Sequence, residues 1–513
     1  MRFFNLLGCL FFCQTWLSAQ FCHPQDSLEL IKFYNSTNGQ NSTLTWDLSQ
    51  PVSTWEWVGM NSQGRVKSIW LLGKNLSGTL PELDLPFLAL LGLENNNIGG
   101  ALPTFDLMPA LSELKLGSNN FVGNVPIFDL PFLQTIDLHN NQLTGKIPNF
   151  SLPIVLSISL DHNQLSGEIP NFNTPNLGSL NLSHNQLTGS VPNFTNKPLL
   201  THLYCQNNQL SGSLPGFENL ANLEWLYFDN NQLSGSIPTF ELQKLRAISL
   251  RNNQFDGNIP SLNLPELNFL LLGENQLSGE IPDMNLPKLF NLELWRNQLS
   301  GELPDFGSNK VKIIEIRYNR FTFAGLEELV DSTNLFFKCA PQAKIPIHVS
   351  GNLLSVNAGG TLMNNTYFWF KDSVMVAEIT DDSTFEATEP GIYFCKISNS
   401  ILSNPISGDS LVLESDLLDL TVSTSDFSEK FIFTISPNPI SEGQPFQILL
   451  ENDFFGTVKF EILSLDGRVI SVFEKDKTLR KQVFQTLNLP AGGPFLVRFS
   501  DGRQSVVRFA LKF

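Results

Sequence analysis

Hydrophobic and polar positions between residues 65 and 325 repeat one pattern every 22 or 23 residues. A full copy reads L-x-x-L-x-L-x-x-N-x-L-S-G-x-I-P-x-F, and its second half is seen in "LDHNQLSGEIPNF" from Leu160 to Phe172. The asparagine of this pattern recurs at Asn96, Asn119, Asn141, Asn163, Asn185, Asn208, Asn231, Asn253, Asn275, Asn297 and Asn319. A fixed period in this range is typical of a solenoid, and the pattern predicts about twelve stacked units.

Each unit contains one short predicted strand. In "LSELKLGSN", from Leu111 to Asn119, Leu114 and Leu116 alternate with polar residues, as expected of a strand with one buried face. Such a strand is too short to fold alone, but parallel copies about 4.8 Å apart complete each other's hydrogen bonds. We expect the asparagine that follows to bond the backbone of its own turn and of the next, forming a ladder. The Gly of "SG" permits unusual backbone conformations, and the Pro of "IP" favours an extended return path.

Phenylalanine is the most overused residue, with 42 copies against 6 tyrosines. The repeat accounts for this excess, because one slot per unit holds Phe105, Phe128, Phe150, Phe172, Phe194, Phe217, Phe240 and Phe306, with Leu262 and Met284 in the same slot of other units. We predict that these side chains form a stacked apolar spine beneath the convex side. A second proline in many units predicts an extended or polyproline-like return rather than a helix.

This pattern resembles the leucine-rich repeat family, in the "LSGxIP" subtype best known from plant surface receptors. The resemblance implies a curved solenoid whose parallel sheet lines a concave, ligand-facing side. Residues 20–64 are predicted to cap the solenoid, because the first repeat would otherwise expose its core. Within them, "DSLELIKFYNSTNG" is expected to be helical, and "WEWVGM" resembles the cap motif of such receptors without its cysteines.

The period stops after Phe323, and two β-sandwich domains are expected to follow, at residues 336–420 and 431–513. The predicted fold class is therefore mainly β. In the first domain, Trp369 and "EPGIYFC" resemble the immunoglobulin-like sandwich, in which a core Trp packs and a Tyr two residues before a Cys makes a corner bond. Cys339 lies too far ahead of Trp369 to be the usual first cysteine, so the sequence does not decide whether Cys339 and Cys395 form a disulfide.

The last domain, 431–513, carries "SPNP", a central "DGR" and a basic-apolar final strand. These features resemble the C-terminal sorting domain of type IX secretion in Gram-negative Bacteroidetes, although Phe495 stands in a slot that usually holds Tyr. The resemblance implies that the secretion machinery is a partner and that the tail is removed at the cell surface. One more ordinary β-sandwich is the alternative.

Residues 1–19 read as an export signal, with Arg2, an apolar run from Phe3 to Phe12 and a small-residue site ending at Ala19. The run is too short for a membrane anchor, and no later apolar run is long enough to span a bilayer. We therefore expect a secreted or outer-surface protein without an integral membrane segment. A net charge of -17 argues against a nucleic-acid partner, which would need a basic stripe.

Known hydrolytic and phosphate-binding motifs are absent from the sequence, so the concave face is the candidate functional surface. Tyr204 and Tyr227 occupy the same outward slot of neighbouring strands, and Phe269 and Trp295 are expected to extend an aromatic patch. The candidate ligand-binding residues are His202, Tyr204, Gln206, Trp225, Tyr227, Asp229, Arg251, Phe269 and Trp295. Aromatic anchors ringed by polar groups suit a protein hot spot and also sugar rings. The alternative is that these aromatics merely cover the sheet.

Glu293 and Glu315 share a slot in adjacent strands, a pairing that could serve a retaining glycosidase. The alternative is a charge ladder balanced by Arg296 and Arg317. An open sheet has no cleft that excludes water, so we expect no enzyme.

Three histidines, His139, His162 and His184, fall near successive strand ends, where turn solvation is favoured over a metal site. Cys205 takes an inward leucine slot and is expected to be a buried, unreactive thiol. No metal and no cofactor are expected. The favoured function is an exported recognition or adhesion protein with a protein or glycan ligand; a Glu293/Glu315 glycosidase and an inert surface rod are the alternatives.

Overall fold

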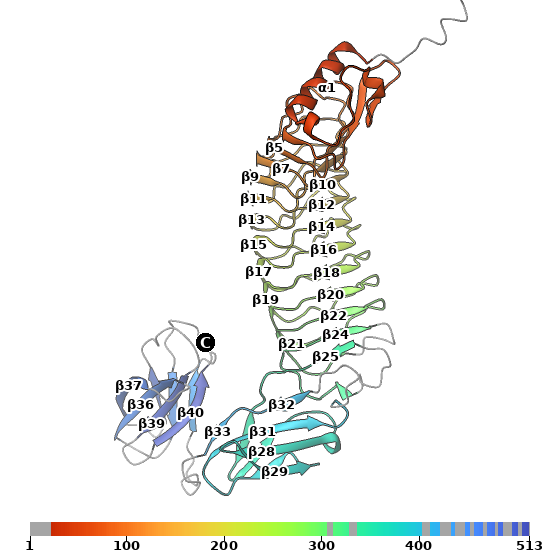
Figure 1. The fold of residues 1–513 in the computed structure, drawn as a ribbon. Coiled ribbons are helices and arrows are strands. Elements are labelled where there is room, and N and C mark those ends of the chain that lie inside the picture. Colours follow the sequence, from red (N-terminus) through yellow and green to blue (C-terminus); the bar gives the residue numbers. More distant parts are fainter. Residues whose placement is uncertain are drawn as a thin grey trace, which may run out of the picture. The chain divides into compact units, whose positions relative to one another are not determined.

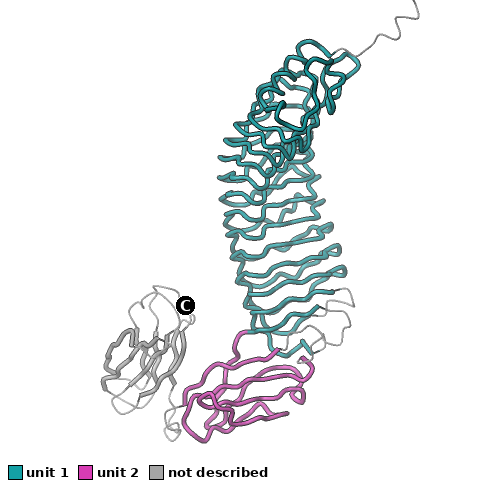
Figure 2. The backbone as a smooth tube through the Cα atoms, viewed as in Figure 1, with its two compact units in different colours: residues 1–342, 405–410 teal, residues 343–404, 411–513 magenta. Residues whose placement is uncertain are grey.

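The computed structural model describes residues 22–304, 311–327, 336–402 and 411–420, together with the backbone of strands between 432 and 511. The chain divides into two units, shown in Figure 2: residues 1–342 with 405–410, and residues 343–404 with 411–513. The predicted export signal and Phe306 lie outside the described residues. Within the described part of the chain, no helix has the length and apolar content needed to cross a bilayer.

The N-terminal end of unit 1 is built on α1 (Pro24–Ser36), two short 3-10 turns, η1 (Gly39–Asn41) and η2 (Val52–Thr54), and strand β1 (Val58–Met60). Helix α1 begins where the Nδ1 of His23 accepts a hydrogen bond from the Gln25 N–H, and it buries Leu30 and Phe33 completely. The buried Asp26 carboxylate accepts hydrogen bonds from the Val66 N–H and the Arg65 guanidinium. These bonds fix the helix to the first strand of the repeats.

One face of unit 1 is a 14-stranded sheet in which β1 pairs antiparallel and the following strands pair parallel. The parallel strands are β2 (Val66–Trp70), β4 (Leu90–Gly92), β6 (Glu113–Lys115), β8 (Thr135–Asp137), β10 (Ser157–Ser159), β12 (Ser179–Asn181), β14 (His202–Tyr204), β16 (Trp225–Tyr227), β18 (Ala247–Ser249), β20 (Phe269–Leu271), β22 (Asn291–Glu293), β24 (Ile313–Glu315) and β25 (Phe336–Lys338). Figure 1 shows that the stack bends toward this sheet. The predicted fold class, mainly β with a parallel-stranded solenoid, is confirmed.

The opposite side of the stack forms a second, 11-stranded parallel sheet that the sequence analysis did not predict. Its strands are β3 (Ser77–Thr79), β5 (Asn97–Ala101), β7 (Asn120–Asn124), β9 (Gln142–Lys146), β11 (Gln164–Gly167), β13 (Gln186–Gly189), β15 (Gln209–Gly212), β17 (Gln232–Gly235), β19 (Gln254–Gly257), β21 (Gln276–Glu280) and β23 (Gln298–Ser300). Each "NQLSG" segment therefore pairs with its copies in the neighbouring turns. The Gly of "SG" has a φ near +79°, as at Gly167, which explains why this position rejects larger residues.

Leucines fill the space between the two sheets, and the predicted phenylalanine spine is buried with them. The exposed fractions of Phe105, Phe128, Phe150, Phe172, Phe194, Phe217 and Phe240 are 3% or less. Ring centroids lie 5.6 Å apart between Phe128 and Phe150 and 5.7 Å apart between Phe150 and Phe172. Leu262 fills the same slot with an exposed fraction of 1%, whereas Met284 is only half-buried.

A buried lysine interrupts this interior. Lys197 occupies a slot that holds Leu130, Leu152 and Leu220 in other units, and its exposed fraction is 0%. Its ammonium group donates hydrogen bonds to the carbonyl oxygens of Phe172, at 2.6 Å, and Thr195, at 3.3 Å. Burial lowers the pKa of Lys197 below its ordinary value. The repeat pattern alone does not predict a buried lysine at this position.

Replacing Lys197 with leucine is expected to raise the free energy of unfolding by about 1–3 kcal/mol at pH 7, because a desolvated cation is removed. The lost bond to Phe172 offsets part of this gain. Since the folded state holds the Lys197 proton less tightly than the unfolded state, wild-type stability should rise as pH rises toward 10.5. The difference between variant and wild type should therefore shrink between pH 7 and pH 10, as measured by urea unfolding of the full chain. The exposed Lys146→Leu is the control, and an equal response of both variants would contradict the assignment.

Unit 2 begins with a three-stranded antiparallel sheet of β26 (Ile347–Ser350), β27 (Leu353–Val356) and β30 (Thr384–Glu386). A second sheet contains β29 (Val374–Thr380), β28 (Asn365–Lys371), β31 (Ile392–Asn399), β32 (Val412–Glu414) and β33 (Leu418–Asp419), with the short turn η4 (Leu362–Asn364) before β28. Trp369 is fully buried and pairs in register with Cys395. The predicted corner bond is present, because the Tyr393 hydroxyl donates to the Glu389 carbonyl at 2.6 Å.

Whether Cys339 and Cys395 form a disulfide stays undecided. Cys339 belongs to unit 1 and follows β25, whereas Cys395 is buried in β31 of unit 2. Burial raises the pKa of the Cys395 thiol to about 12, so it stays protonated at neutral pH.

The C-terminal segment contains two antiparallel sheets of which the backbone is described. One has β34 (Ile432–Ser436), β35 (Gln447–Glu451) and β38 (Lys481–Gln485); the other has β37 (Val469–Lys477), β36 (Gly456–Ser464), β39 (Phe495–Ser500) and β40 (Ser505–Leu511). The "DGR" motif and most of "SPNP" lie outside the described residues.

Candidate functional site

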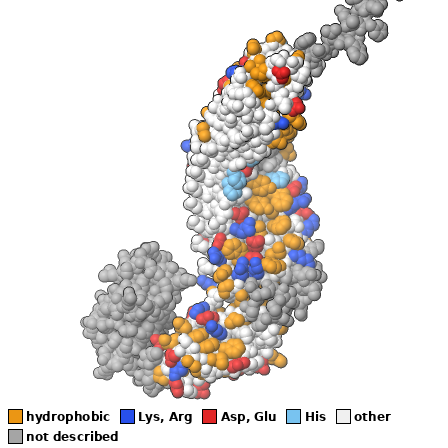
Figure 3. Space-filling model, in the orientation of Figure 1, with side chains coloured by type: hydrophobic (Ala, Val, Ile, Leu, Met, Phe, Trp, Pro, Cys, Tyr) orange, Lys and Arg blue, Asp and Glu red, His pale blue; other side chains and the backbone are white. Residues whose placement is uncertain are grey.

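The outer face of the 14-stranded sheet carries three rows of side chains. The strands pair residue for residue, as His202 with Trp225 and Tyr204 with Tyr227, so each outward position forms a straight row across the sheet. The first row contains His202, Trp225, Ala247, Phe269 and Asn291; the second contains Tyr204, Tyr227, Ser249, Leu271, Glu293 and Glu315; the third, two residues further on, contains Gln206, Asp229, Arg251, Gly273, Trp295 and Arg317. Figure 3 shows hydrophobic side chains gathered along this side, with histidines and charged groups among them.

Four rings on β14 and β16 form an aromatic platform, defined here as His202, Tyr204, Trp225 and Tyr227. The His202 and Trp225 rings are 6.2 Å apart and nearly parallel, at 14°, and the Trp225 and Tyr227 rings are 6.3 Å apart at 11°. Tyr204 and Tyr227 lie 5.4 Å apart, confirming that the shared slot makes them neighbours. All four side chains are half-buried. Burial raises the pKa of both tyrosines, so their hydroxyls stay neutral and can donate hydrogen bonds.

Beside the platform lies a charged bridge, defined as Asp229, Ser249, Arg251 and Glu293. The buried Asp229 accepts hydrogen bonds from the Ser249 hydroxyl, the Arg251 backbone N–H at 3.0 Å and the Arg251 Nε at 3.1 Å. The Arg251 Nη1 then reaches Glu293 Oε2 at 3.1 Å, two turns further along the stack. The bridge holds the guanidinium in one position and borders the platform with fixed charges.

Phe269 and Trp295 do not extend the aromatic platform, and that prediction is wrong. In the first row, the small and fully buried Ala247 separates Phe269 from Trp225, and the Phe269 ring packs instead edge-on against Phe290, at 6.2 Å. The Trp295 indole lies over Gly273, where an added Cβ would fall 2.5 Å from its Nε1. The predicted residues thus share one face but divide into a platform, a charged bridge and two outlying aromatics.

Among the residues of the three rows named above, two acceptors have no hydrogen-bond partner within the described part of the chain. They are Gln206 Oε1, in the third row next to Asp229, and Asn291 Oδ1, in the first row next to Phe269. Asn291 was not a predicted site residue, although its outward slot beside Phe269 could have identified it. A buried acceptor without a partner is rare in folded proteins, so both atoms are available to a ligand's N–H groups or to water.

Glu293 and Glu315 do pair in register on neighbouring strands, but the carboxylate of each is already in an ion pair. Glu293 forms an ion pair with Arg251 at 3.1 Å. Glu315 forms ion pairs with Arg317 and with Lys338, both at 3.2 Å. The predicted partner Arg296 instead binds Glu274 at 2.6 Å, because its backbone lies in the left-handed turn rather than on the strand. This arrangement is typical of a structural charge ladder rather than of an acid and nucleophile pair.

The histidines at the strand ends form pairs with neighbours. His162 and His184 stack with centroids 4.0 Å apart, and His139 contacts Asp137 and Ser118. Across the described ranges, no cluster of three or more His, Cys, Asp or Glu side chains could hold a metal ion. Cys205 is fully buried, and burial raises its thiol pKa well above the ordinary value, as its inward slot predicted.

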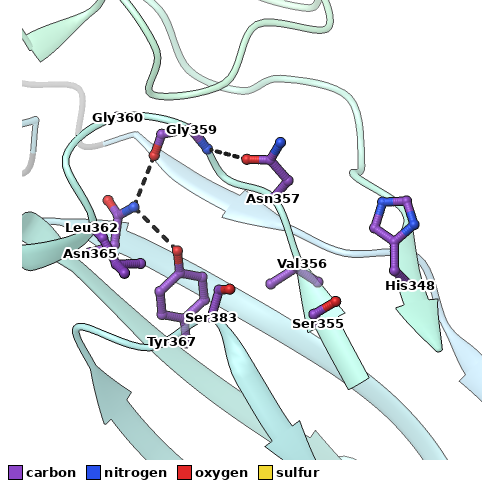
Figure 4. A pocket seen from close by; sticks show the side chains of 10 residues that line it. All are labelled: His348, Ser355, Val356, Asn357, Gly359, Gly360, Leu362, Asn365, Tyr367 and Ser383. Carbon is purple, nitrogen blue, oxygen red and sulfur yellow. Dashed lines mark hydrogen bonds between the residues drawn. The ribbon is translucent and has the colours of Figure 1, made fainter. Parts of the chain in front are cut away.

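A cavity of about 220 Å³ lies in unit 2, lined by residues of β27, η4 and β28 (Figure 4). One of its polar side chains is held by its neighbours: Asn365 Nδ2 donates to the Gly359 carbonyl at 2.9 Å and to the Tyr367 hydroxyl at 3.3 Å. Asn399 Nδ2 in turn donates to Asn365 Oδ1 at 2.8 Å. These bonds fix the loop before β28, and we therefore interpret the cavity as a structural feature of unit 2 rather than as a ligand site.

Comparison with known proteins identifies the repeats. A family model described as "Leucine Rich Repeat" matches residues 132–151, 176–197 and 222–240. Pollen receptor-like kinase 1 of Arabidopsis thaliana is 35% identical over 107 residues, which cover 20% of this chain and 16% of that protein. Receptor-like kinase TMK4 of the same plant is 30% identical over 110 residues, covering 19% and 12%. The chain therefore matches only a small part of the length of either relative.

Two solved structures are similar over about half of the chain. The crystal structure of a TDR receptor has 28% identity and a TM-score of 0.47, covering 54% of this chain and 56% of its own. The plant peptide hormone receptor RGFR1 in complex with RGF2 has 29% identity and a TM-score of 0.47, covering 55% and 52%.

Proposed function

We propose that this leucine-rich repeat protein is an exported recognition protein that binds a protein ligand on the outer face of its 14-stranded sheet. The observation that carries the proposal is the aromatic platform, four half-buried rings set side by side on the 14-stranded sheet and bordered by the charged bridge. Trp, Tyr and Arg are the residues that dominate binding energy at protein interfaces.

The polar groups around the platform suit a polypeptide ligand. Gln206 Oε1 and Asn291 Oδ1 are buried acceptors without partners, and an extended peptide carries N–H donors that could satisfy them. The tyrosine hydroxyls add donors for peptide carbonyls. Because Arg251 is held by Asp229 and Glu293, it needs no reordering when a ligand arrives, which lowers the entropic cost of binding.

A glycan is the second candidate ligand. The planes of His202, Trp225 and Tyr227 deviate from parallel by only 14° and 11°, and parallel rings can stack against a flat sugar face. The same platform would then bind through ring faces, with the charged bridge accepting sugar hydroxyls.

Export and surface location are parts of the same proposal. They rest on the signal-like residues 1–19 and on the likeness of 431–513 to a type IX sorting domain, which would make the secretion machinery a second partner. The segment predicted as 336–420 is proposed to be an immunoglobulin-like spacer from residue 343 on, because β25 (Phe336–Lys338) belongs to the solenoid sheet. The buried Trp369 and the Tyr393–Glu389 corner bond support this proposal.

Panning a random peptide display library on the full chain tests the binding surface. We expect enriched peptides whose affinity falls about thirtyfold or more with Trp225→Ala or Tyr227→Ala, the loss typical of a hot-spot residue. The control is Phe132→Ala, an exposed aromatic outside the three rows. A glycan array run in parallel separates the two ligand classes. If no peptide and no glycan binds, or if Phe132→Ala weakens binding as much as Trp225→Ala, the inert-rod alternative replaces the proposal.

A further inference from the structure

Three polar side chains at the ends of β6 and β8 form a hydrogen-bonded relay, defined here as Asp137, His139 and Ser118. Asp137 Oδ1 lies 2.6 Å from His139 Nδ1, and His139 Nε2 lies 3.2 Å from Ser118 Oγ. The proposed ligand platform does not use these groups, because it begins at β14. The two nitrogens of one imidazole thus join a carboxylate to a hydroxyl.

The repeat places these three groups together. Asp137 and His139 are two residues apart at the end of β8, so both side chains point to the same face. Ser118 belongs to the previous turn, at a left-handed position with φ of +54°. Gly117 lies under the imidazole, and a Cβ there would fall 2.2 Å from His139 Cε1. The missing side chain lets the ring lie flat and keeps it in place.

The hydrogen-bond directions are determined by chemistry. The Asp137 carboxylate can only accept, so His139 carries a proton on Nδ1 and leaves Nε2 as an acceptor. Asn140 Nδ2 can only donate, and it lies 3.2 Å from Ser118 Oγ. The Ser118 hydroxyl therefore accepts from Asn140 and donates its proton to His139 Nε2. A nucleophile bonded to a base that a third group orients is the arrangement of nucleophilic hydrolases.

We propose that Ser118 is a nucleophile that accepts acyl groups from carboxylic esters, with His139 as its general base and Asp137 as a positioning residue. Ser118 Oγ attacks the ester carbonyl carbon while its proton moves to His139 Nε2. The C–O bond to the alcohol then breaks, and the alcohol leaves with that proton, so that an acyl-serine remains. Water cleaves this ester by the same route, releasing the carboxylic acid and restoring the hydroxyl.

The surroundings indicate the substrate class. Ser118 and His139 are half-buried on an open face, so the ester must be small or must lie at an accessible end of a larger molecule. Asn140 Nδ2 donates to Ser118 Oγ and so fixes the orientation of the hydroxyl in the turn. On the same face, two strands before β6, Trp70 and Leu72 are exposed by 42% and 48% and offer an apolar surface to an acyl chain. An accessible ester with an apolar acyl group fits these features.

The test is the hydrolysis of p-nitrophenyl acetate by the full chain. Ser118→Asn is the central variant, because the same turn position holds Asn95, Asn140, Asn207 and Asn230, and the fold should be kept. We expect Ser118→Asn and His139→Gln to lower the rate about a hundredfold or more, the lower end of what a positioned general base contributes. Mass spectrometry should find acetyl on Ser118 in the wild type. Ser166→Ala, a serine on β11 of the opposite sheet, should change nothing.

The pH profile separates positioning from a merely structural role. The hydrogen bond to Asp137 raises the pKa of His139, with smaller contributions from the Asp137, Asp161 and Glu94 charges, against the lowering effect of burial. Activity should rise with pH as His139 loses its proton, with a midpoint above the ordinary histidine value. Asp137→Asn should lower the rate and move that midpoint to lower pH. Gly117→Ala, which keeps all three groups but displaces the imidazole, should also lower the rate.

An unchanged rate in Ser118→Asn would overturn the proposal, as would acetyl recovered only on other residues. Urea midpoints of every variant are measured alongside the rates. A rate loss that follows lost stability in all variants, with no shift of the pH midpoint in Asp137→Asn, would assign the relay a structural role instead.

Discussion

Replacing Asn163 with alanine is expected to lower the free energy of unfolding by about 3 kcal/mol, because four hydrogen bonds are lost. The buried Leu143 N–H would lose its partner, whereas the carbonyl oxygens of the other three groups each keep one other donor. Asn163 Nδ2 donates to the carbonyl oxygens of Leu138, Leu160 and Asp161, at 3.0, 3.1 and 3.2 Å. Its Oδ1 accepts from the Leu143 N–H at 2.9 Å. Leu138 and Leu143 belong to the previous turn, so one amide holds two turns together. Urea unfolding of the full chain measures the effect.

The matched control is Gln164→Ala, one residue further along. Gln164 is exposed on β11, and its truncation should change stability by no more than about 0.5 kcal/mol. Similar losses in both variants would mean that the asparagine ladder contributes little and that leucine packing alone sets the turn spacing.

Replacing Phe150 with alanine is expected to cost about 3–5 kcal/mol, the range for truncating a buried aromatic. Phe150 is fully buried between Phe128 and Phe172, and its ring is within 20° of parallel to both. Alanine would leave a cavity that neighbouring turns cannot close, because the asparagine ladders on either side fix their spacing. Thermal and urea unfolding of the full chain measure the loss.

Two further variants test whether the slot needs bulk or an aromatic ring. Phe150→Leu should cost less than about 1.5 kcal/mol, since Leu262 fills the equivalent slot in its own turn. Phe132→Ala, with an exposed fraction of 59%, should cost little. If Phe150→Ala is no more harmful than Phe132→Ala, the phenylalanines are not a spine.

The repeat predicted the solenoid because each physical requirement recurs at a fixed position. The alternation around Leu114 and Leu116 determined a strand with one buried face, and the constant step kept the strands in register. The asparagine was predicted to bond two turns, and it does so in the turns that carry Asn96 to Asn319.

The second sheet was missed because "NQLSG" contains turn-forming residues and only one buried apolar position. Its strands form through pairing with copies in neighbouring turns, which no single segment shows. Lys197 was missed for a related reason. A lone lysine reads as a surface residue unless its slot is compared with Leu130 and Leu152 in the other units.

The candidate face was predictable where neighbours share a slot, as Tyr204 and Tyr227 do. The ion pairs on this face were not predictable, because a long side chain such as that of arginine can reach several carboxylates. Arg251 reaches Glu293, 42 residues away, and Arg296 prefers Glu274. The Ser118–His139 contact also depends on the absence of a side chain at Gly117, which a pattern of leucines does not reveal.

Hydroxyl-radical footprinting with and without a peptide selected on the full chain tests the binding account most directly. The account predicts that oxidation of Trp225 and Tyr227 falls several-fold when the peptide is present, while Trp57, exposed by 58% near the N-terminal end, reacts as before. Unchanged oxidation of Trp225 and Tyr227, together with protection of Trp57, would contradict it.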